Sequence, residues 1–452
     1  MDQTIDSSVT QRLAREVATT PAASIPAAAL DAMKRLFIDH IGITYMGHAF
    51  CGQALHDYAR DVGGRPDAVL IGSGARVSAE LAAGVNAQVC RNTDFEETGP
   101  AQHTGPLNIH TAFAMAQRTG ASGREMLAAS ALGYVLNSRF HFARRTDNTA
   151  PQHRIVSAAI AARLNGFDTE KTARAMSLAL EIPLRPHAFP LDAKAPKAKR
   201  ISPLGMQPLF HARAGVQAVV MIEHGFESVG DELDNNVGDY DIAALTDPAT
   251  PWGAIAEHME LKPWVCSRGA QCAMQALDEL VKQHGIDARA IKAIRLRLSK
   301  MYLRPHQWDP APDNYWQAIY STQWAASMVL QQIPPGPKWV VADRLADPFA
   351  RKLAAMVEIT EDEESTRAYV ELRRLDCRGS VEIDVGGKTL SASCTNRNTW
   401  GAGGKPMTDA MIADKFLEAT SLSMAPSRAR ELLAALQSIE DVADVRTIAA
   451  LL

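Results

Sequence analysis

The sequence predicts a mainly α-helical protein, in which both chain ends build a large all-helical domain and a smaller α/β domain is inserted between them. Apolar residues recur at helical spacing, with Ala as the favoured filler, from Pro26 to about Gly225. The two-residue alternation of half-buried strands begins after about Leu261. Amphipathic helical spacing then returns after Thr408, a plausible N-cap, and continues to the end of the sequence.

The helical domain is expected to begin with short, Ala-rich segments. Small side chains allow neighbouring helices to approach closely, which favours a compact all-α arrangement. Gly47, Gly166 and Gly225 each follow an apolar run, so we expect each to cap a helix at its C-terminus. The expected helices are 27–46, 78–90, 126–134, 155–164 and 169–180.

A proline-rich stretch interrupts the helical pattern between residues 182 and 213. It also holds the basic residues Lys194, Lys197, Lys199 and Arg200. A structureless connection of this length inside a compact domain is usually either functional or disordered. We expect a functional loop here, and a mobile surface crossover is the alternative.

The α/β domain is expected to contain four strands and two helices. Ile294, Leu296 and Leu298 alternate with arginines, which is the period of a half-buried strand. The Gly386-Gly387 pair is expected to join a strand at 381–385 to residues 388–393 as a tight hairpin. The other expected elements are a strand at 369–372 and helices at 317–331 and 347–356.

Two helices at 429–436 and 442–452 are expected to complete the chain. Their composition resembles that of the first domain, so we expect them to pack back onto it. The predicted all-helical domain therefore comprises residues 1–259 and 400–452. The predicted α/β domain comprises residues 260–399.

Composition and charge narrow the class of function. The chain has 452 residues with 47 basic and 51 acidic side chains, a formal net charge of −4. Nucleic-acid binding needs a net basic face, so this balance argues against a nucleic-acid partner. No uninterrupted run of eighteen apolar residues is present, and the first twenty residues lack the apolar core of a secretory signal. We therefore expect a cytoplasmic protein, not bound to a membrane, that acts on a small molecule or on another protein.

The sequence gives no sign of a metal or a cofactor. Its six cysteines form no CxxC pair and no spacing typical of zinc ligands or of a disulfide framework, so we expect reduced thiols. A P-loop, a GxGxxG after a strand, an HExxH and a GxSxG are all missing. We therefore expect neither a nucleotide cofactor nor serine hydrolysis.

The sharpest local feature is an acidic segment at residues 92–98, followed by His103. It combines Asp94 and two glutamates with hydroxyl groups and an imidazole, which proton transfer at a small acid would need. A polar loop with an N-cap Asp is an equally good interpretation of the spacing alone. Two further histidines, His153 before a helix and His187 in the proline-rich stretch, are by themselves more typical of solvated or capping residues.

Two groups of cations could bind carboxylates. Lys197, Lys199 and Arg200 lie in the proline-rich stretch, and Lys262 and Arg268 lie where the two expected domains meet. Arg is the bidentate partner of a carboxylate and Lys is a point charge, and ligand sites often lie between domains. A solvated charged face is the plainer interpretation of the first group.

Taken in order, several segments resemble the MmgE/PrpD family, which includes 2-methylcitrate dehydratase, cis-aconitate decarboxylase and iminodisuccinate epimerase. The resemblance covers nearly the whole chain, and it depends on the order and spacing of the segments. It implies an all-helical domain from both chain ends, an α/β lid domain and a homodimer. The segments are 37–42, 92–98 with His103, 120–125, 161–168, Lys199-Arg200, Asp347-Pro348 and 407–416.

The resemblance also implies site residues. It places Asp94, Thr98, His103 and Lys199 in the active site, with Lys197 as the alternative lysine. His153 corresponds to a family histidine if a few intervening residues have been lost.

At two positions the sequence departs from the family pattern. A usual histidine is Gln271 here, and a common tyrosine is Trp324. Gln cannot exchange a proton near neutral pH, and indole is only a donor. If both residues face the site, the proton-transfer groups are altered.

We therefore expect a cofactor-independent lyase that acts on a small di- or tricarboxylate, resembling 2-methylcitrate dehydratase. Asp94 or His103 would move the proton at a carbon next to a carboxylate, with His153 as the partner acid. Lys199 and Arg268 would hold the anion that forms, and Thr98 would bind the substrate. The further expected binding residues are Lys197, Lys262 and Gln271. The alternatives are an epimerase, isomerase or decarboxylase of a related acid, such as iminodisuccinate or cis-aconitate, and a degenerate member that binds a carboxylate without turnover.

Overall fold

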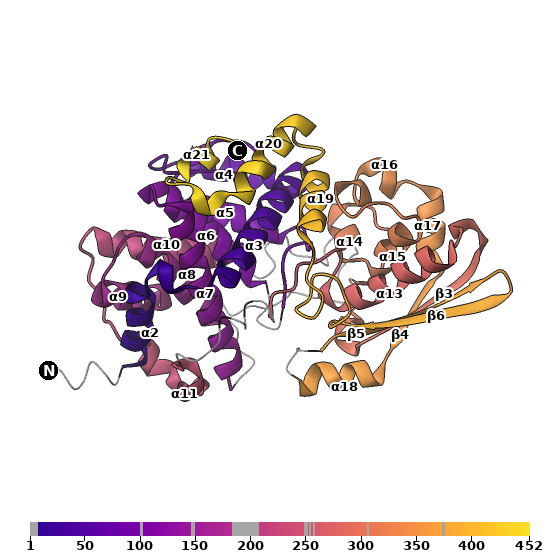
Figure 1. Ribbon diagram of the computed structural model, residues 1–452, viewed down its shortest axis with the longest axis horizontal. Helices are drawn as coiled ribbons and strands as arrows, with labels where there is room; N and C mark the ends of the chain where they lie inside the picture. The colour runs from indigo at the N-terminus through magenta and orange to yellow at the C-terminus, as the bar shows by residue number, and fades with distance from the viewer. Residues whose placement is uncertain are drawn as a thin grey trace.

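The computed structural model describes residues 8–99, 103–145, 150–182, 208–247, 252, 255, 258–304, 307–372 and 376–452. They form two parts, which Figure 1 shows side by side: a helical body, and an α/β unit around a four-stranded sheet. Each part has its own cluster of buried hydrophobic side chains. The predicted class, mainly α with a smaller α/β part, is confirmed.

The helical body contains long, Ala-rich helices that pack side by side, among them α5 with α6 and α8 with α10. Several begin at a polar cap, because the side chains of Ser78, Ser122 and Asp168 accept hydrogen bonds from backbone N–H groups three residues later. Two antiparallel strands of two residues each, β1 (Ala68–Val69) and β2 (Arg76–Val77), lie between α4 and α5. The helices are α2 (Val9–Thr19), α3 (Ala27–Gly47), α4 (Gln53–Val62), α5 (Ala79–Arg91), α6 (Thr104–Thr119), α7 (Gly123–Ala143), α8 (Ala150–Leu164), α9 (Thr169–Glu181), α10 (Pro208–Glu223) and α11 (Ile242–Leu245).

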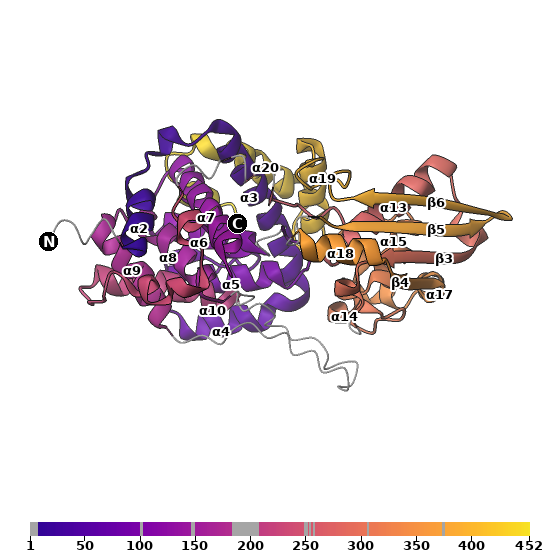
Figure 2. The ribbon, with the colours of Figure 1, turned by 90° about the horizontal axis from the view of Figure 1, so that it is seen from below.

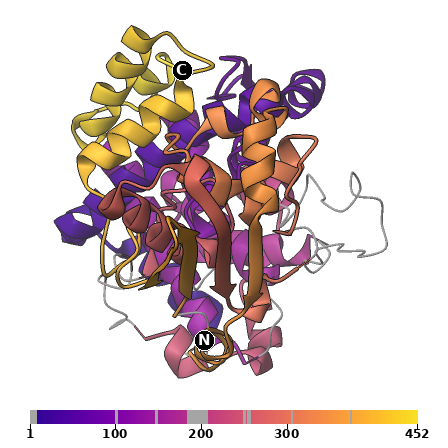
Figure 3. The same cartoon turned by 90° about the vertical axis from the view of Figure 1, so that its right-hand side faces the viewer.

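The C-terminal helices complete this body. Helices α19 (Asp409–Thr420) and α20 (Pro426–Gln437) both contact α3, and the short α21 (Arg446–Ala449) follows them. Figures 1 and 3 show these helices in yellow against the indigo N-terminal part. The contact with α3 is close, because a Cβ added at Gly42 would lie 2.9 Å from the Phe416 ring. The helical body is thus built from both chain ends.

The α/β unit is a sheet with strand order β4-β3-β5-β6, which Figure 2 shows clearly. Strand β3 runs parallel to β4 and antiparallel to β5, and β5 pairs with β6 through the Gly386-Gly387 turn. Helix α13 packs on β3, β5 and β6, while α15 and α17 pack on β4. The elements are α13 (Arg268–His284), β3 (Ile291–Leu298), α14 (Tyr315–Tyr320), α15 (Thr322–Leu330), α16 (Ala342–Leu345), α17 (Pro348–Ala355), β4 (Val357–Glu361), α18 (Glu363–Glu371), β5 (Arg378–Val385) and β6 (Lys388–Thr395).

The prediction of a strand at residues 369–372 is wrong. Nearly all of that segment belongs to helix α18, which begins after Asp362. The Asp362 side chain accepts a hydrogen bond from the Ser365 backbone N–H, and two glutamates occupy the first turn. A capped N-terminus with negative charge in its first turn favours a helix, and it outweighs the strand preference of Tyr369 and Val370.

Three other expectations need correction. Gly47 does not end a helix, because α3 continues into a π-helical turn at His48–Gly52. The helix expected at 317–331 is two helices, separated at Ser321, whose hydroxyl accepts a hydrogen bond from the Trp324 N–H. The helix expected at 442–452 is reduced to the four residues of α21.

Residues 183–207, which make up most of the proline-rich stretch, lie outside the described residues, as do His187, Lys197 and Lys199. None of the described helices combines the length and the apolar character that a bilayer crossing requires. The six cysteines, all of them within the described ranges, are unbridged thiols.

Candidate active site

The acidic loop, defined as residues 92–99, begins where helix α5 ends at Arg91. Asp94 in this loop has a φ of 46°, and His103, at the N-terminus of α6, has a φ of 28°. Among the described residues, Gln332 is the other non-glycine position with a positive φ. Such conformations cost about 1–3 kcal/mol and persist where the surroundings enforce them. The backbone is therefore strained at two residues that the sequence singles out for proton transfer.

The loop brings Asp94, Glu96 and His103 together. One polar atom from each side chain lies within 4.8 Å of the others. The His103 Nδ1 contacts the Glu96 carboxylate, and the Arg91 Nη1 lies 3.3 Å from both Asp94 Oδ1 and Glu96 Oε1. The Asp94 and Glu96 side chains are 3% and 0% exposed, whereas His103 is 16% exposed. The imidazole is thus the most accessible member of this acid-base cluster.

Two buried cations balance the two carboxylates. Lys262 donates from Nζ to the Asp94 carbonyl at 2.8 Å and to Asp94 Oδ1 at 3.1 Å. Burial disfavours the charge of Arg91, but Tyr320, Glu96 and Asp94 outweigh it and raise the Arg91 pKa above its ordinary value. Two carboxylates and an imidazole could also ligate a metal ion. Because both carboxylates are already paired with fixed cations, the cluster is better suited to proton transfer.

Donors from outside the acidic loop bind four of its backbone carbonyls. They come from the α/β unit, from helix α19 and from the linking segment, which we define as residues 260–266 between the two parts. The loop is therefore positioned through its backbone as well as through its side chains. The pairs are Tyr315 OH to Asn92 O at 3.0 Å, Lys262 Nζ to Asp94 O at 2.8 Å, Lys415 Nζ to Phe95 O at 2.9 Å, and Glu260 N to Thr98 O at 2.8 Å.

Four predicted binding residues line one small cavity beside the loop: Thr98, Lys262, Arg268 and Gln271. Its volume is about 20 Å³, room for about one water molecule rather than a tricarboxylate. Arg268 makes a bidentate ion pair with Glu260, with both N–O distances at 2.6 Å. Its Nη1 has no hydrogen-bond partner among the described residues. Arg268 therefore fixes the linking segment through Glu260, and its Nη1 could donate to a further acceptor.

The two departures from the family pattern have structural explanations. The Gln271 amide donates to the backbone carbonyls of Trp264 and Cys266 at 3.0 and 2.9 Å and accepts from the Trp264 N–H at 3.3 Å. Trp324 is 1% exposed in the core of the α/β unit, and its indole N–H donates to the Trp339 carbonyl at 2.8 Å. Gln271 thus clamps the linking segment, and Trp324 is a core residue.

Replacing Gln271 with Ala is expected to lower the free energy of unfolding by about 2–3 kcal/mol, because it leaves buried backbone groups of Trp264 and Cys266 unpaired. Urea unfolding followed by circular dichroism measures this. Gln283 lies exposed on the same helix, so Gln283→Ala is the matched control and should change stability by less than about 0.5 kcal/mol. Equal effects of the two substitutions would contradict the clamp.

His153 lies on helix α8. Its ring packs edge-on against the ring of His211, with 5.6 Å between the two ring centres. The preceding Gln152 donates to Asn137 at 3.5 Å, and Asn137 donates to the hydroxyl of Thr104 at 2.5 Å. Thr104 directly follows His103, so this network joins the start of α8 to the start of α6. The other predicted residues, Lys197 and Lys199, lie outside the described residues.

Glu97 anchors the start of helix α6 from behind the loop. Its Oε2 accepts a hydrogen bond from the Gly105 N–H at 2.9 Å, and the Tyr134 hydroxyl donates to its Oε1. A side chain at Gly105 would not fit, because its Cβ would lie 2.5 Å from His40 Nε2. Burial raises the pKa of Glu97 to about 8, although both hydrogen bonds act to lower it. The carboxyl is therefore largely protonated at neutral pH.

Replacing Glu97 with Gln is expected to change how stability depends on pH. The folded-state pKa of about 8 lies above the ordinary value of 4.5, so the wild-type carboxyl contributes stability that is fully present below about pH 4.5. That stability is lost as the pH rises through about 8, by at most about 1.4 kcal/mol per pH unit. Urea unfolding of both proteins between pH 5 and 9 measures this. As the pH rises, the free energy of unfolding of the variant should increase relative to that of the wild type. A pH-independent difference would contradict this assignment.

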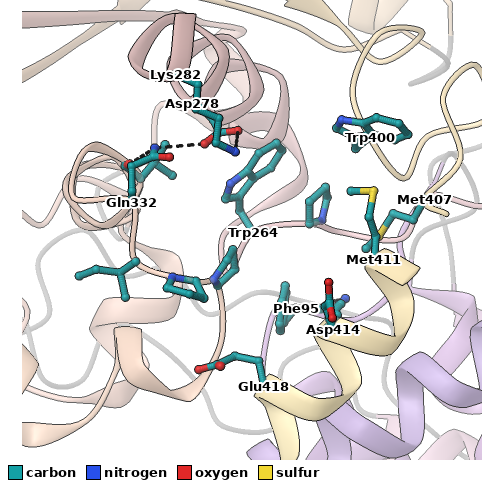
Figure 4. A pocket seen from close by; sticks show the side chains of 16 residues that line it. Phe95, Trp264, Asp278, Lys282, Gln332, Trp400, Met407, Met411, Asp414 and Glu418 are labelled. Carbon is teal, nitrogen blue, oxygen red and sulfur yellow. Dashed lines mark hydrogen bonds and ion pairs between the residues drawn. The ribbon is translucent and has the colours of Figure 1, made fainter. Parts of the chain in front are cut away.

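A larger pocket of about 430 Å³ lies between helix α19 and the α/β unit. Figure 4 shows Met411, Asp414 and Glu418 of α19 on one side and Asp278 of α13 on the other, with Trp264 between them. The pocket shares Phe95 with the acidic loop and has Lys415 in its wall. None of the three acid-base residues lines it.

The sequence did not single out two charged residues of this region, Arg91 and Lys415. Two signals were available. Arg91 directly follows an apolar helical run, where a cation stabilises the helix end. Lys415 lies on α19 at helical spacing with the buried Ile412 and Phe416, and a lysine on an apolar stripe needs a buried partner.

Comparisons with known proteins give two family matches. The model of the MmgE/PrpD N-terminal domain matches residues 11–250, and the model of the MmgE/PrpD C-terminal domain matches residues 264–441. No curated protein matches the chain.

Proposed function

The chain belongs to the MmgE/PrpD family, and from this premise we propose that it is a cofactor-independent lyase acting on a small di- or tricarboxylate. The first candidate reaction is dehydration of a 2-methylcitrate-type acid. The observation that carries the proposal is the cluster of Asp94, Glu96 and His103, backed by the buried cations Arg91 and Lys262. Such a cluster supplies an acid-base group within a fixed electrostatic environment.

His103 is the proposed base. The contact of its Nδ1 with the Glu96 carboxylate favours the tautomer that carries the proton on Nδ1, which leaves Nε2 as the acceptor. Nε2 takes the proton from the carbon next to a carboxylate, and the electron pair passes into that carboxylate as an aci-anion. The imidazolium then returns the proton to the departing hydroxyl, so that one water molecule leaves and a carbon-carbon double bond forms.

Cations would hold the carboxylates of the substrate. The open Nη1 of Arg268 is one candidate, and Lys199 or Lys197 is the other, with Thr98 and His153 as further proposed contacts. The small cavity at Arg268 does not hold a tricarboxylate as it stands. Binding would therefore require the α/β unit to move relative to the body, as active sites closed by a mobile domain do.

The test is incubation of the purified protein with 2-methylcitrate, cis-aconitate and iminodisuccinate in deuterated water, followed by NMR. Loss of water from 2-methylcitrate supports the proposal. Deuterium at the α-carbon without net loss of water or CO₂ would assign an epimerase, and loss of CO₂ would assign a decarboxylase. No exchange or turnover with a broad panel of acids would reject catalysis and favour a carboxylate-binding protein.

The family resemblance also implies a homodimer, which we propose for this chain. Light scattering should give about twice the 48.9 kDa of one chain. A mass of one chain at micromolar concentration would contradict a stable dimer.

A further inference from the structure

Lys415 brings together three parts of the chain. Its side chain on helix α19 is 4% exposed. Its Nζ lies 2.7 Å from Asp39 Oδ1, 2.9 Å from the Phe95 carbonyl and 2.8 Å from the Lys262 carbonyl. An ammonium group has three N–H donors, so these three acceptors satisfy it fully. They belong to α3, to the acidic loop and to the linking segment.

Stability alone does not explain the buried ammonium group of Lys415. Burial lowers the pKa of Lys415, and the Asp39 carboxylate opposes that effect. Apolar side chains of similar volume often replace a buried ion pair without loss of stability. The ammonium lies 3.9 Å from the centre of the Phe95 ring, so an apolar side chain would find apolar contact there. An apolar residue, however, could not donate hydrogen bonds to two backbone carbonyls.

One of those two carbonyls belongs to the acidic loop, and the other belongs to Lys262, the buried cation that pairs with Asp94. Phe95 directly follows Asp94 in the acidic loop. Lys262 contacts both the carbonyl and the carboxylate of Asp94 through its own Nζ. Lys415 therefore fixes the residue after Asp94 and the backbone of the lysine that contacts Asp94. A shift of the linking segment would be transmitted to Asp94 through both bonds.

We propose that Lys415 is a positioning residue, which ties the acidic loop to the linking segment and so sets the geometry of Asp94 relative to Lys262. The catalytic part of this inference rests on the proposed function. The structural part rests on the three contacts of the Lys415 ammonium and is testable without turnover.

The test compares Asp39→Asn with the double variant Asp39→Asn/Lys415→Met. The single variant removes the ion pair but keeps both bonds from the ammonium to the carbonyls. The double variant removes those bonds without leaving a buried carboxylate unpaired. A difference between the two variants therefore reports the loss of the ammonium, with its bonds to the Phe95 and Lys262 carbonyls and its contact with the Phe95 ring.

Amide hydrogen exchange by mass spectrometry is the first measurement. In the double variant we expect exchange to rise at least about tenfold at the paired backbone N–H groups of Thr98 and Glu260, which join the same two segments. Exchange in α6 and α7 should stay as in Asp39→Asn. Unchanged exchange at Thr98 and Glu260 would overturn the structural part, whether or not a substrate has been found.

Steady-state kinetics is the second measurement, with whichever acid the protein turns over. A displacement of about 1 Å costs on the order of 10²-fold in rate, so kcat should fall by about that factor in the double variant while KM stays within about threefold. Equal kcat in the two variants would overturn the catalytic part. If no acid is turned over by the wild type, the proposed function fails and the exchange result still decides the structural part.

Chemical rescue separates positioning from packing. Lys415 lies in the wall of the 430 Å³ pocket of Figure 4, so a truncated side chain there leaves space that a small amine can reach. Propylammonium should restore part of the kcat of Lys415→Ala, and propanol at the same concentration should not. Equal effects of the two compounds, or no effect of the amine in a folded variant, would contradict a role for the ammonium donors. If Lys415→Ala does not fold, Lys415→Arg, which retains a buried donor, should recover more kcat than Lys415→Met.

Discussion

Replacing His103 with Asn is expected to lower kcat by about 10²–10⁴-fold, the usual contribution of a general acid-base group. Asn keeps an N–H donor near the position of Nδ1, so the contact with Glu96 survives. Asn also tolerates a positive φ better than most residues, so the backbone at His103 should be preserved. The substitution removes the titratable Nε2 and little else. Steady-state kinetics with the acid identified by NMR measures the effect.

An exposed histidine provides the control for this prediction. His224 lies on the surface of the helical body, far along the chain from the acidic loop. His224→Asn should leave kcat unchanged. If folded His103→Asn has a kcat within threefold of the wild type, another residue is the base. Asp94 would then be the next residue to replace.

The acidic loop was predictable because its chemistry is local. Asp94 and His103 lie within ten positions of each other, and no structure is needed to notice their combination. Their electrostatic partners were harder to find. Lys262 is 168 positions from Asp94, and from the sequence it was expected to bind substrate rather than a loop carboxylate. The positive φ angles of Asp94 and His103 also had no sequence signal, because neither residue is a glycine.

The side-chain environments of Gln271 and Trp324 could not be read from the sequence. From the sequence, both could have altered the proton-transfer groups of the site. The amide of Gln271 is occupied by backbone groups five and seven positions away, and the indole of Trp324 is buried in the hydrophobic core of the α/β unit. Residue type gives the chemistry that a side chain could perform. Which partners occupy that side chain depends on packing that one sequence does not reveal.

Replacing Lys262 with Met is expected to have the largest effect on stability, a loss of about 3–5 kcal/mol. Lys262 is 1% exposed and pairs with the buried carboxylate of Asp94. Met fills a similar volume, but it leaves that carboxylate with Arg91 at 3.3 Å as its remaining ion-pair partner in the described structure. It also releases the Asp94 carbonyl. Urea unfolding measures the loss, and turnover should fall together with stability.

A double-mutant cycle distinguishes the ion pair from simple loss of packing. Asp94→Asn removes the carboxylate charge and suits the positive φ at that position. Lys262→Met is expected to destabilise the protein because it leaves the Asp94 carboxylate with one fewer cation. If so, Lys262→Met should lower the free energy of unfolding by at least about 1 kcal/mol less in the Asp94→Asn background than in the wild type. Additive effects would show that Lys262 stabilises the fold through its aliphatic chain and its bond to the Asp94 carbonyl. In that case the buried charge balance would not favour proton transfer at the cluster, and only the geometry of His103 would support its role as the base.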